Sequence, residues 1–332
     1  MIFITIVIIN IFLIFSKRKK YQYLKKRIYF FNIILILILG LRGEKVGIDT
    51  FGYVKAYLKS LDYNLFLGEK IYNFEFGYSL FSQICKKLNI NKNLYLLITS
   101  FIILTPIFNI CKKYSKDYFL SIYIYICLGF YMFNFSGLRQ SIAISLAFYS
   151  YNFIKNREFF KFILCLILGI SFHKTMIIFV PAYFLYGLRI KKEIEIIILL
   201  ILFIFKKNFF MLGKIIKPNL VIVYTHAYTM LIFMLAIYIL FFLIKRKNMY
   251  IVTYKNYLMM TIYIQVFASL SNTIMRLGYY YYIFIILLIP EIIYDLKKNK
   301  LKKELQVLII CFLLLFYCLK KIEIYNYYLF WQ

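Results

Sequence analysis

The chain has 332 residues, of which 64% are hydrophobic, and its 42 Lys and Arg against 13 Asp and Glu give a formal net charge of +29. A water-soluble domain does not need so large a hydrophobic fraction, whereas a polytopic membrane protein does. The charge does not indicate nucleic-acid binding, because the basic residues stand in short clusters between apolar stretches, where the positive-inside rule places them. The six cysteines are scattered without a CxxC pair, which argues against a disulfide framework or a zinc knuckle.

Twelve apolar stretches predict an all-α, polytopic bundle of about twelve transmembrane helices. They lie at 2–16, 28–41, 93–111, 118–134, 138–154, 159–172, 176–188, 194–205, 229–244, 257–272, 279–294 and 304–319. Several are shorter than the roughly 20 residues that a perpendicular helix needs. Flanking Tyr, Lys and Asn would then complete the crossing, or the bilayer would thin locally. Tyrosines often stand near the ends of these stretches, as interfacial belts require. No internal repeat or low-complexity linker appears, so residues 1–332 are interpreted as a single domain.

The distribution of basic residues predicts that the N-terminus lies outside. More than half of the Lys and Arg then fall in six short inner loops, at 17–27, 112–116, 155–161, 189–193, 245–256 and 295–303. The remainder is spread over far longer outer segments, as the positive-inside rule expects. The first stretch has no small-residue cleavage site after it, so we expect it to be retained.

Residues 159–188 would form a helix about 45 Å long at 1.5 Å per residue, which is too long for one crossing. We therefore expect a hairpin that breaks at Ser171–Thr175. Two outer segments, a large one at 42–92 and a medium one at 206–228, are too long to be mere connectors. Within the first, apolar residues recur every four positions over 76–88, which predicts an amphipathic helix on the outer surface.

This topology collects the unusual polar residues on the outer side. They are Arg42, Asp49, Glu75, Arg139, Gln140, His173, Lys174, His226 and Arg276. An ionisable side chain at membrane depth is costly and needs a partner, which makes Arg139 and His173 candidates for a functional site. The alternative is that Arg139 reaches a headgroup phosphate and His173 merely ends a helix. Each carboxylate taken alone is more often a solvated or salt-bridged loop residue than a catalytic one.

The set suits a lipid-diphosphate substrate, because arginine pairs bidentately with phosphate oxygens and can stabilise a departing diphosphate. A carboxylate or histidine nearby could accept the proton of an acceptor hydroxyl. Asp49 lies seven residues beyond Arg42 in a turn-prone stretch, so we expect both to face one outer pocket. No Ser-His-Asp order, HExxH, Walker loop or metal-spaced carboxylate pair is present, so nothing calls for a metal or a cofactor.

The order of these motifs resembles the EpsG-like branch of the Wzy-type polysaccharide polymerases, which act in exopolysaccharide, capsule and O-antigen synthesis. The matching stretches are Arg42-Gly43, Asp49-Thr50, Tyr53, Glu75–Tyr78, Gly137–Ala143, Phe172–Thr175, and Arg276 with Tyr279–Tyr282. The resemblance runs through nearly the whole chain, and its specific part is confined to residues 42–181. Lys174 departs from the pattern, because the family's residue there is often small or apolar.

The resemblance implies a multi-pass protein of the bacterial cytoplasmic membrane that joins oligosaccharide repeat units carried on undecaprenyl diphosphate at the outer face. The growing chain would leave its lipid diphosphate and attach to a hydroxyl of the incoming unit. Arg42, Arg139 and Arg276 would hold the diphosphates, with Gln140 and His226 in support. The catalytic base would be Asp49, Glu75 or His173, in falling order of preference. Partners would be the lipid-linked oligosaccharide, membrane lipids, a chain-length regulator and a flippase.

Three other readings stay open. A flippase or exporter of lipid-linked sugars also needs buried arginines and about twelve spans, but its cations would more often lie in a cavity at mid-span. A membrane O-acyltransferase would use His173 as its base and needs an acyl-donor channel. The third of these alternatives is a purely structural scaffold.

Overall fold

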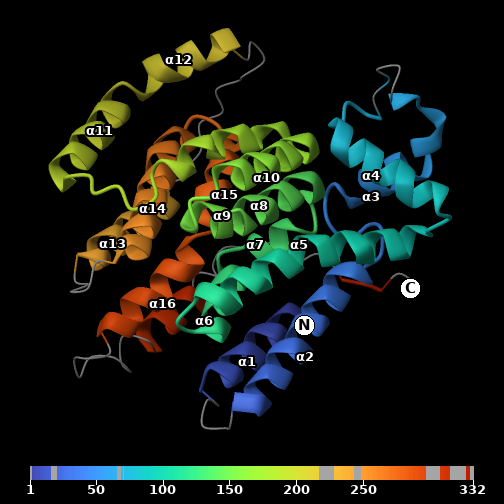
Figure 1. Ribbon diagram of the computed structural model, residues 1–332, viewed down its shortest axis with the longest axis horizontal. Coiled ribbons are helices and arrows are strands. Elements are labelled where there is room, and N and C mark those ends of the chain that lie inside the picture. Colours follow the sequence, from blue (N-terminus) through green and yellow to red (C-terminus); the bar gives the residue numbers. More distant parts are fainter. Residues whose placement is uncertain are drawn as a thin grey trace.

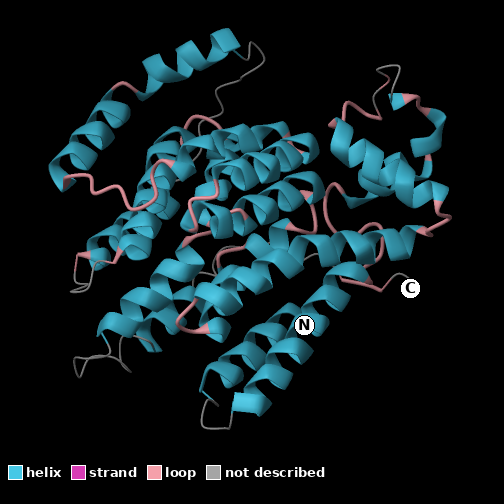
Figure 2. Cartoon of the chain, viewed as in Figure 1, coloured by secondary structure: helices cyan, strands magenta, loops and turns pink. Residues whose placement is uncertain are grey.

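The computed structural model of the chain describes residues 2–15, 21–65, 69, 71–216, 228–242, 248–296, 307–314 and 327–329. Every named element in these ranges is a helix (Figure 2). The described residues add one isolated antiparallel bridge, between Arg42 and Leu329. The all-α prediction is therefore confirmed.

The helices follow one another closely along the chain (Figure 1). They are α1 (Ile2–Phe15), α2 (Tyr21–Gly40), α3 (Thr50–Leu58), η1 (Ser60–Asp62), α4 (Phe76–Lys87), α5 (Lys92–Tyr114), α6 (Tyr118–Cys127), α7 (Phe130–Phe133), α8 (Leu138–Tyr149), α9 (Tyr151–Lys155), α10 (Phe159–Phe172), η3 (Lys174–Tyr183), α11 (Lys192–Ile204), α12 (Lys206–Ile216), α13 (Tyr228–Phe241), α14 (Met249–Ala268), α15 (Asn272–Tyr282) and α16 (Ile285–Leu296). Residues 307–314 are also helical.

The predicted apolar stretches are helical wherever they are described, but several are broken. Gly129 adopts a left-handed φ of 86° and separates α6 from α7 within the stretch 118–134. By length and composition, α5 is the one helix in the described ranges that could cross a membrane alone. The pair Ile274–Tyr282 and Ile285–Asp295, bent by 47°, could make a second crossing. Twelve crossings therefore stay a prediction.

The predicted hairpin is confirmed at Ser171–Thr175, where α10 ends and η3 turns back along it. The start of one helix meets the end of the other, because the Tyr183 hydroxyl donates to the Arg157 carbonyl at 3.0 Å and the Arg157 guanidinium donates back to the Tyr183 carbonyl at 3.1 Å. A Cβ atom on Gly169 would overlap the Met176 sulfur, so glycine permits the close approach of the two helices. His173 stands at the turn.

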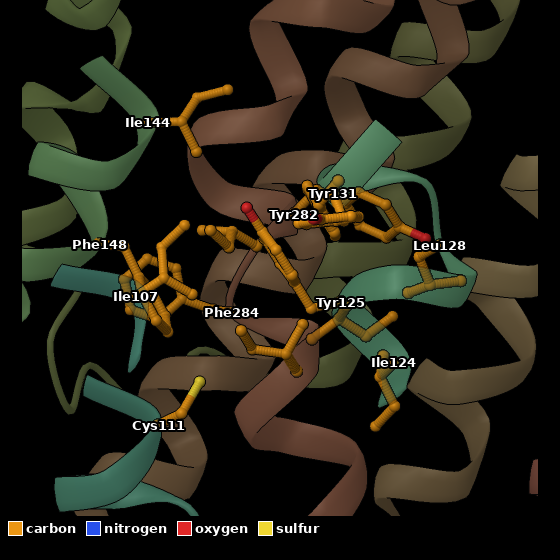
Figure 3. Close-up of a cluster of buried hydrophobic side chains, with 14 of the residues drawn as sticks. Ile107, Cys111, Ile124, Tyr125, Leu128, Tyr131, Ile144, Phe148, Tyr282 and Phe284 are labelled. Carbon is orange, nitrogen blue, oxygen red and sulfur yellow. The ribbon is translucent and has the colours of Figure 1, made fainter. Parts of the chain in front are cut away.

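Buried tyrosines hold the bundle together, which the prediction of interfacial belts did not foresee. Figure 3 shows Tyr125, Tyr131 and Tyr282 inside a cluster of apolar side chains. Several hydroxyls donate to main-chain carbonyls of distant helices, as Tyr131 does to Leu35 at 2.8 Å and Tyr281 to Ile178 at 2.8 Å. In these pairs the ring fills apolar volume while the hydroxyl bonds a carbonyl, so two distant helices gain a specific contact.

The segment 42–92 folds as a small helical layer of α3, η1 and α4 beside the start of α5 (Figure 1). The predicted amphipathic helix is confirmed as α4. The amide of Gln83 ties this helix to η1 by donating to the Ser60 and Tyr63 carbonyls, at 2.8 and 2.7 Å. A Cβ atom on Gly77 would overlap Ser171, so the first turn of α4 packs directly on the end of α10. This contact brings Glu75 to the hairpin turn.

Candidate functional site

Glu75 is the residue on which the candidate site is built. It occupies the N-cap of α4 with extended backbone angles, yet its carboxylate makes no capping bond to its own helix. Both oxygens instead bind residues from elsewhere in the chain: Oε2 pairs with Arg139, and Oε1 lies 3.0 Å from His173 Nδ1. The side chain is only 14% exposed, so these partners replace water.

Arg139 reaches Glu75 from the second position of α8, two residues after the N-cap residue Gly137. Its guanidinium lies 4.2 Å from the ring centroid of Phe74 and 5.9 Å from that of Tyr53, an arrangement that favours a cation on an aromatic surface. Its Nε has no hydrogen-bond partner among the described residues. That Nε is buried, but 20% of the side chain is exposed, so Arg139 is held in place and can still meet a ligand.

His173 comes to Glu75 because α10 ends there. It is the C-cap of α10, with φ −156° and ψ 111°, and this extended conformation turns the chain out of the helix. The next main-chain N–H, that of Lys174, donates to the same Glu75 oxygen at 3.3 Å. The Lys174 side chain is exposed. A carboxylate that accepts from Nδ1–H leaves Nε2 of the neutral ring as a proton acceptor.

Glu75 is held in its ionised form. Burial acts to raise the pKa of its carboxyl, but the hydrogen bond with His173 and the positive charge of Arg139 outweigh burial and lower the pKa to about 2. A carboxylate this acidic is a poor proton acceptor at neutral pH. Glu75 is therefore suited to hold Arg139 and His173 rather than to act as the base.

Two cavities adjoin this cluster and share Arg139 and Phe74. The larger, of about 480 Å³, is also lined by Glu75, His173 and Lys174. The smaller measures about 400 Å³ and is lined on its other sides by the beginning of α3 and by Tyr72. Arg139 therefore faces two neighbouring volumes, each large enough for part of a sugar or a phosphate group.

Asp49 lines the smaller cavity, near Arg139 but outside the Glu75 cluster. It is the N-cap of α3 and follows Gly47, whose φ of 100° makes the turn. The carboxylate makes no capping bond and is exposed. A proton acceptor or a hydrogen-bond partner for a sugar hydroxyl could act from this position.

Arg42 lies elsewhere, and the expectation that it shares a pocket with Asp49 is wrong. The residue is 0% exposed and lines neither cavity. Its guanidinium donates to the Leu39 carbonyl and lies 5.2 Å from the ring centroid of Phe135. Burial lowers its pKa to about 10, so it remains a cation at neutral pH. The backbone of Arg42 forms the antiparallel bridge with Leu329, and this contact with a distant part of the chain accompanies its burial.

Gln140 and Arg276 connect the cluster to α15. The buried amide of Gln140 donates to the Arg276 carbonyl at 2.8 Å, which ties the start of α8 to α15. One turn further along α15, the Tyr280 hydroxyl meets the Thr175 hydroxyl at 2.8 Å, just beyond the hairpin turn. The Arg276 side chain is exposed and lies 5.9 Å from the Phe133 ring centroid, and it lines neither cavity.

His226 lies outside the described residues. Within the described ranges, no group of three or more His, Cys, Asp or Glu residues could hold a metal ion. Sequence reasoning missed Phe74, the aromatic surface under Arg139, because one aromatic residue does not stand out among 36 Phe and 34 Tyr. It listed Lys174 among the outer polar residues and as a departure from a motif but gave it no role, although its place directly after His173 was a usable signal.

Comparison with known proteins identifies a family for the chain. The model of the EpsG family matches residues 25–332. No curated protein and no solved structure matches the chain. The family match includes every residue of the cluster and of both cavities.

Proposed function

Since the chain belongs to the EpsG family, we propose that it is a polysaccharide polymerase that joins lipid-diphosphate-linked oligosaccharide units. The family indicates a polymerase-type role in polysaccharide biosynthesis, and the apolar helices suit a membrane protein. The finer proposal is a multi-pass protein of the bacterial cytoplasmic membrane that uses undecaprenyl-diphosphate-linked repeat units at the outer face. It rests on one observation, the joint hold of Glu75 on Arg139 and His173 beside a cavity.

Arg139 is the proposed contact for the donor diphosphate. Its guanidinium lines both cavities, and Lys174 adds a second cation to the larger one. Phosphate oxygens accept the paired N–H groups of a guanidinium, and the same groups stabilise the charge that grows on the diphosphate as it departs. Arg276, at the same end of α8, is kept as a further diphosphate contact. Arg42 is proposed to stabilise the end of α2 from its buried position.

His173 is the proposed base, although the sequence alone favoured Asp49 and then Glu75. With Nδ1–H directed to Glu75, Nε2 accepts the proton of the acceptor hydroxyl. The hydroxyl oxygen forms a bond to the anomeric carbon of the donor sugar, and the bond from that carbon to the diphosphate oxygen breaks. The electron pair of the broken bond leaves with the lipid diphosphate. Glu75 orients the imidazole and stabilises the cation that forms.

Asp49 is proposed to bind the acceptor sugar from the smaller cavity. Its exposed carboxylate can accept hydrogen bonds from sugar hydroxyls in the cavity that adjoins the one lined by His173, the two cavities sharing Arg139. The acceptor sugar would then lie in the smaller cavity and extend past Arg139, so that its reactive hydroxyl meets the donor and His173 in the larger one.

The test is polymer synthesis by the purified protein in liposomes that contain undecaprenyl-diphosphate-linked repeat units. The proposal expects a ladder of lengthened oligosaccharides and release of lipid diphosphate. A flippase would instead move single units across the vesicle membrane without lengthening them. An acyltransferase would modify the units only when an acyl donor is supplied. Transport or acylation without a ladder would overturn the proposal.

A further inference from the structure

A third cavity lies between α11 and α14, away from the candidate site. It measures about 290 Å³ and is lined by residues from the start of α11, the end of α13 and the first turns of α14. In Figure 1 these three helices lie at the left, whereas α3 and α4 lie at the right. The polar side chains on its wall are those of Arg189, Lys192, Glu195 and Lys255.

A buried ion pair forms the inner wall of the cavity. Lys255 binds Glu195 Oε1, and the two side chains are only 5% and 2% exposed. The other carboxylate oxygen accepts from the Tyr238 hydroxyl at 2.7 Å. Both oxygens of Glu195 are thus occupied, and Glu195 is the one bond partner of Lys255 Nζ in the described part of the chain. The remaining N–H groups of Lys255 have no protein acceptor there, although the cavity reaches this residue.

Arg189 and Lys192 also line the cavity, and α14 fixes the loop that carries Arg189. Asn256 Nδ2 donates to the Leu185 and Leu188 carbonyls at 2.8 Å, and Gly187 N–H donates to the Thr253 hydroxyl at 2.8 Å. These bonds set the exposed Arg189 at the opening.

Lys192, the first residue of α11, is exposed and also lines the cavity. Its ion pair with Glu193, at 3.9 Å between two exposed groups, is weak and leaves the ammonium accessible. Among the described residues, three cations therefore line the cavity, against one carboxylate whose oxygens are already bound.

We propose that this cavity binds a phosphate-bearing anion, which the surrounding apolar surface identifies as the headgroup of an anionic lipid. An arginine and two lysines around one small cavity match a phosphate. Helix α11, beside the cavity, exposes large apolar side chains along most of its length, as a lipid-facing helix does. These are Ile194, Ile196, Ile197, Ile198, Leu200, Ile201, Phe203 and Ile204. A headgroup in the cavity could therefore keep its acyl chains against α11. This site does not depend on the chemistry at Glu75.

The test is native mass spectrometry of the purified full-length chain, titrated with phosphatidylglycerol or with phosphatidylcholine. We expect one phosphatidylglycerol to bind preferentially, and the double variant Arg189→Gln with Lys192→Gln to lose about fivefold in affinity for each cation removed. Lys191→Gln is the matched control, because Lys191 is exposed, neighbours Lys192 and does not line the cavity. Equal loss in this control would overturn the site in favour of a diffuse basic surface, as would equal binding of the two lipids.

Soluble glycerol phosphate distinguishes the two sources of the anion. If it displaces phosphatidylglycerol from the wild type, the phosphate alone is recognised and a soluble ligand fits the site. If it does not displace the lipid, the acyl chains contribute and the ligand is a lipid. Failure of the wild type to bind either anion would overturn the proposal.

Discussion

Glu75 and His173 are 98 residues apart in the chain, yet Glu75 Oε1 and His173 Nδ1 lie 3.0 Å apart. The contact requires two local structures to end at the same place: α4 begins after Glu75, and α10 ends before His173. Because Arg139 binds the other oxygen of the same carboxylate, one acidic residue positions both a cation and an imidazole.

Arg139→Lys is expected to lower polymer synthesis by about 100-fold or more, with near-normal protein in the membrane. Lysine keeps the charge but loses the planar pair of donors that stabilises the departing diphosphate. The measurement is the polymer ladder per unit of membrane protein. Arg157→Lys is the matched control, because Arg157 binds the carbonyls of Tyr183 and Tyr186 outside the cluster. Wild-type activity in Arg139→Lys would indicate that Arg139 only reaches a headgroup.

His173→Gln is expected to lower the rate of chain extension by roughly 10²- to 10⁴-fold, the range for loss of a general base. Donor binding should survive, because the Glu75–Arg139 pair stays intact. Glu75→Gln should lower the rate of chain extension less than His173→Gln does, because the amide oxygen still accepts from Nδ1–H. It should also weaken donor binding, because Arg139 loses its ionic partner. The measurements are single-turnover extension and separate binding of the lipid-linked unit. Full extension by His173→Gln would remove His173 as the base.

Asp49→Asn is expected to raise the acceptor concentration needed for half-maximal rate, with a maximal rate close to that of the wild type. The amide keeps the shape of the side chain and weakens its hydrogen bonds to sugar hydroxyls. Asp62→Asn, a change at a residue of the same segment that lines neither cavity, is the control. If Asp49→Asn instead stops extension while the donor still binds, Asp49 is the base and the preference reached from the sequence holds.

Much of the site's framework could be predicted from the sequence, because it depends on local patterns. The four-residue apolar repeat placed α4, and hence Glu75 at a helix start, and the length limit on a single crossing placed the hairpin turn at His173. Arg139 was correctly expected at the head of a helix. Each of these inferences needs only neighbouring residues and the geometry of a helix.

The contacts themselves could not be predicted, because they depend on how distant helices pack. Nothing in the sequence near Arg42 shows that Leu329 pairs with it and that the side chain is fully buried. Likewise, nothing near Glu75 in the sequence shows that its carboxylate binds Arg139 of α8 and His173 after α10 and makes no capping bond to its own helix. A single sequence carries no signal for such long-range pairs.

Residues 42–92 are expected outside, and the loop after α13 inside. In a chain without native cysteines, Ile48→Cys should react with an impermeant thiol reagent in intact cells, because Ile48 is 68% exposed. Asn248→Cys, at another exposed position, should react only after the membrane is permeabilised. The measurement is labelling before and after permeabilisation. Reaction of both residues in intact cells would show that α10 and η3 do not return the chain to the inner side.

The contribution of Glu75 to the stability of the protein is expected to change with pH only in the acid range. Its pKa falls from the usual 4.5 to about 2 in the folded chain, so the unfolded state binds the proton more readily. The carboxylate's contribution, on the order of 3 kcal/mol, is fully present above pH 4.5 and is lost as the pH falls through the folded pKa. The contribution of Glu75 to the apparent melting temperature in detergent should therefore be constant from pH 7 to pH 5 and be lost between about pH 4.5 and 2.

Glu75→Gln should melt lower at pH 7 and show a smaller acid drop, whereas Glu158→Gln, a change in an exposed pair with Lys161, should follow the wild type. An identical acid drop in Glu75→Gln and the wild type would mean that the pairs with Arg139 and His173 do not hold the carboxyl ionised.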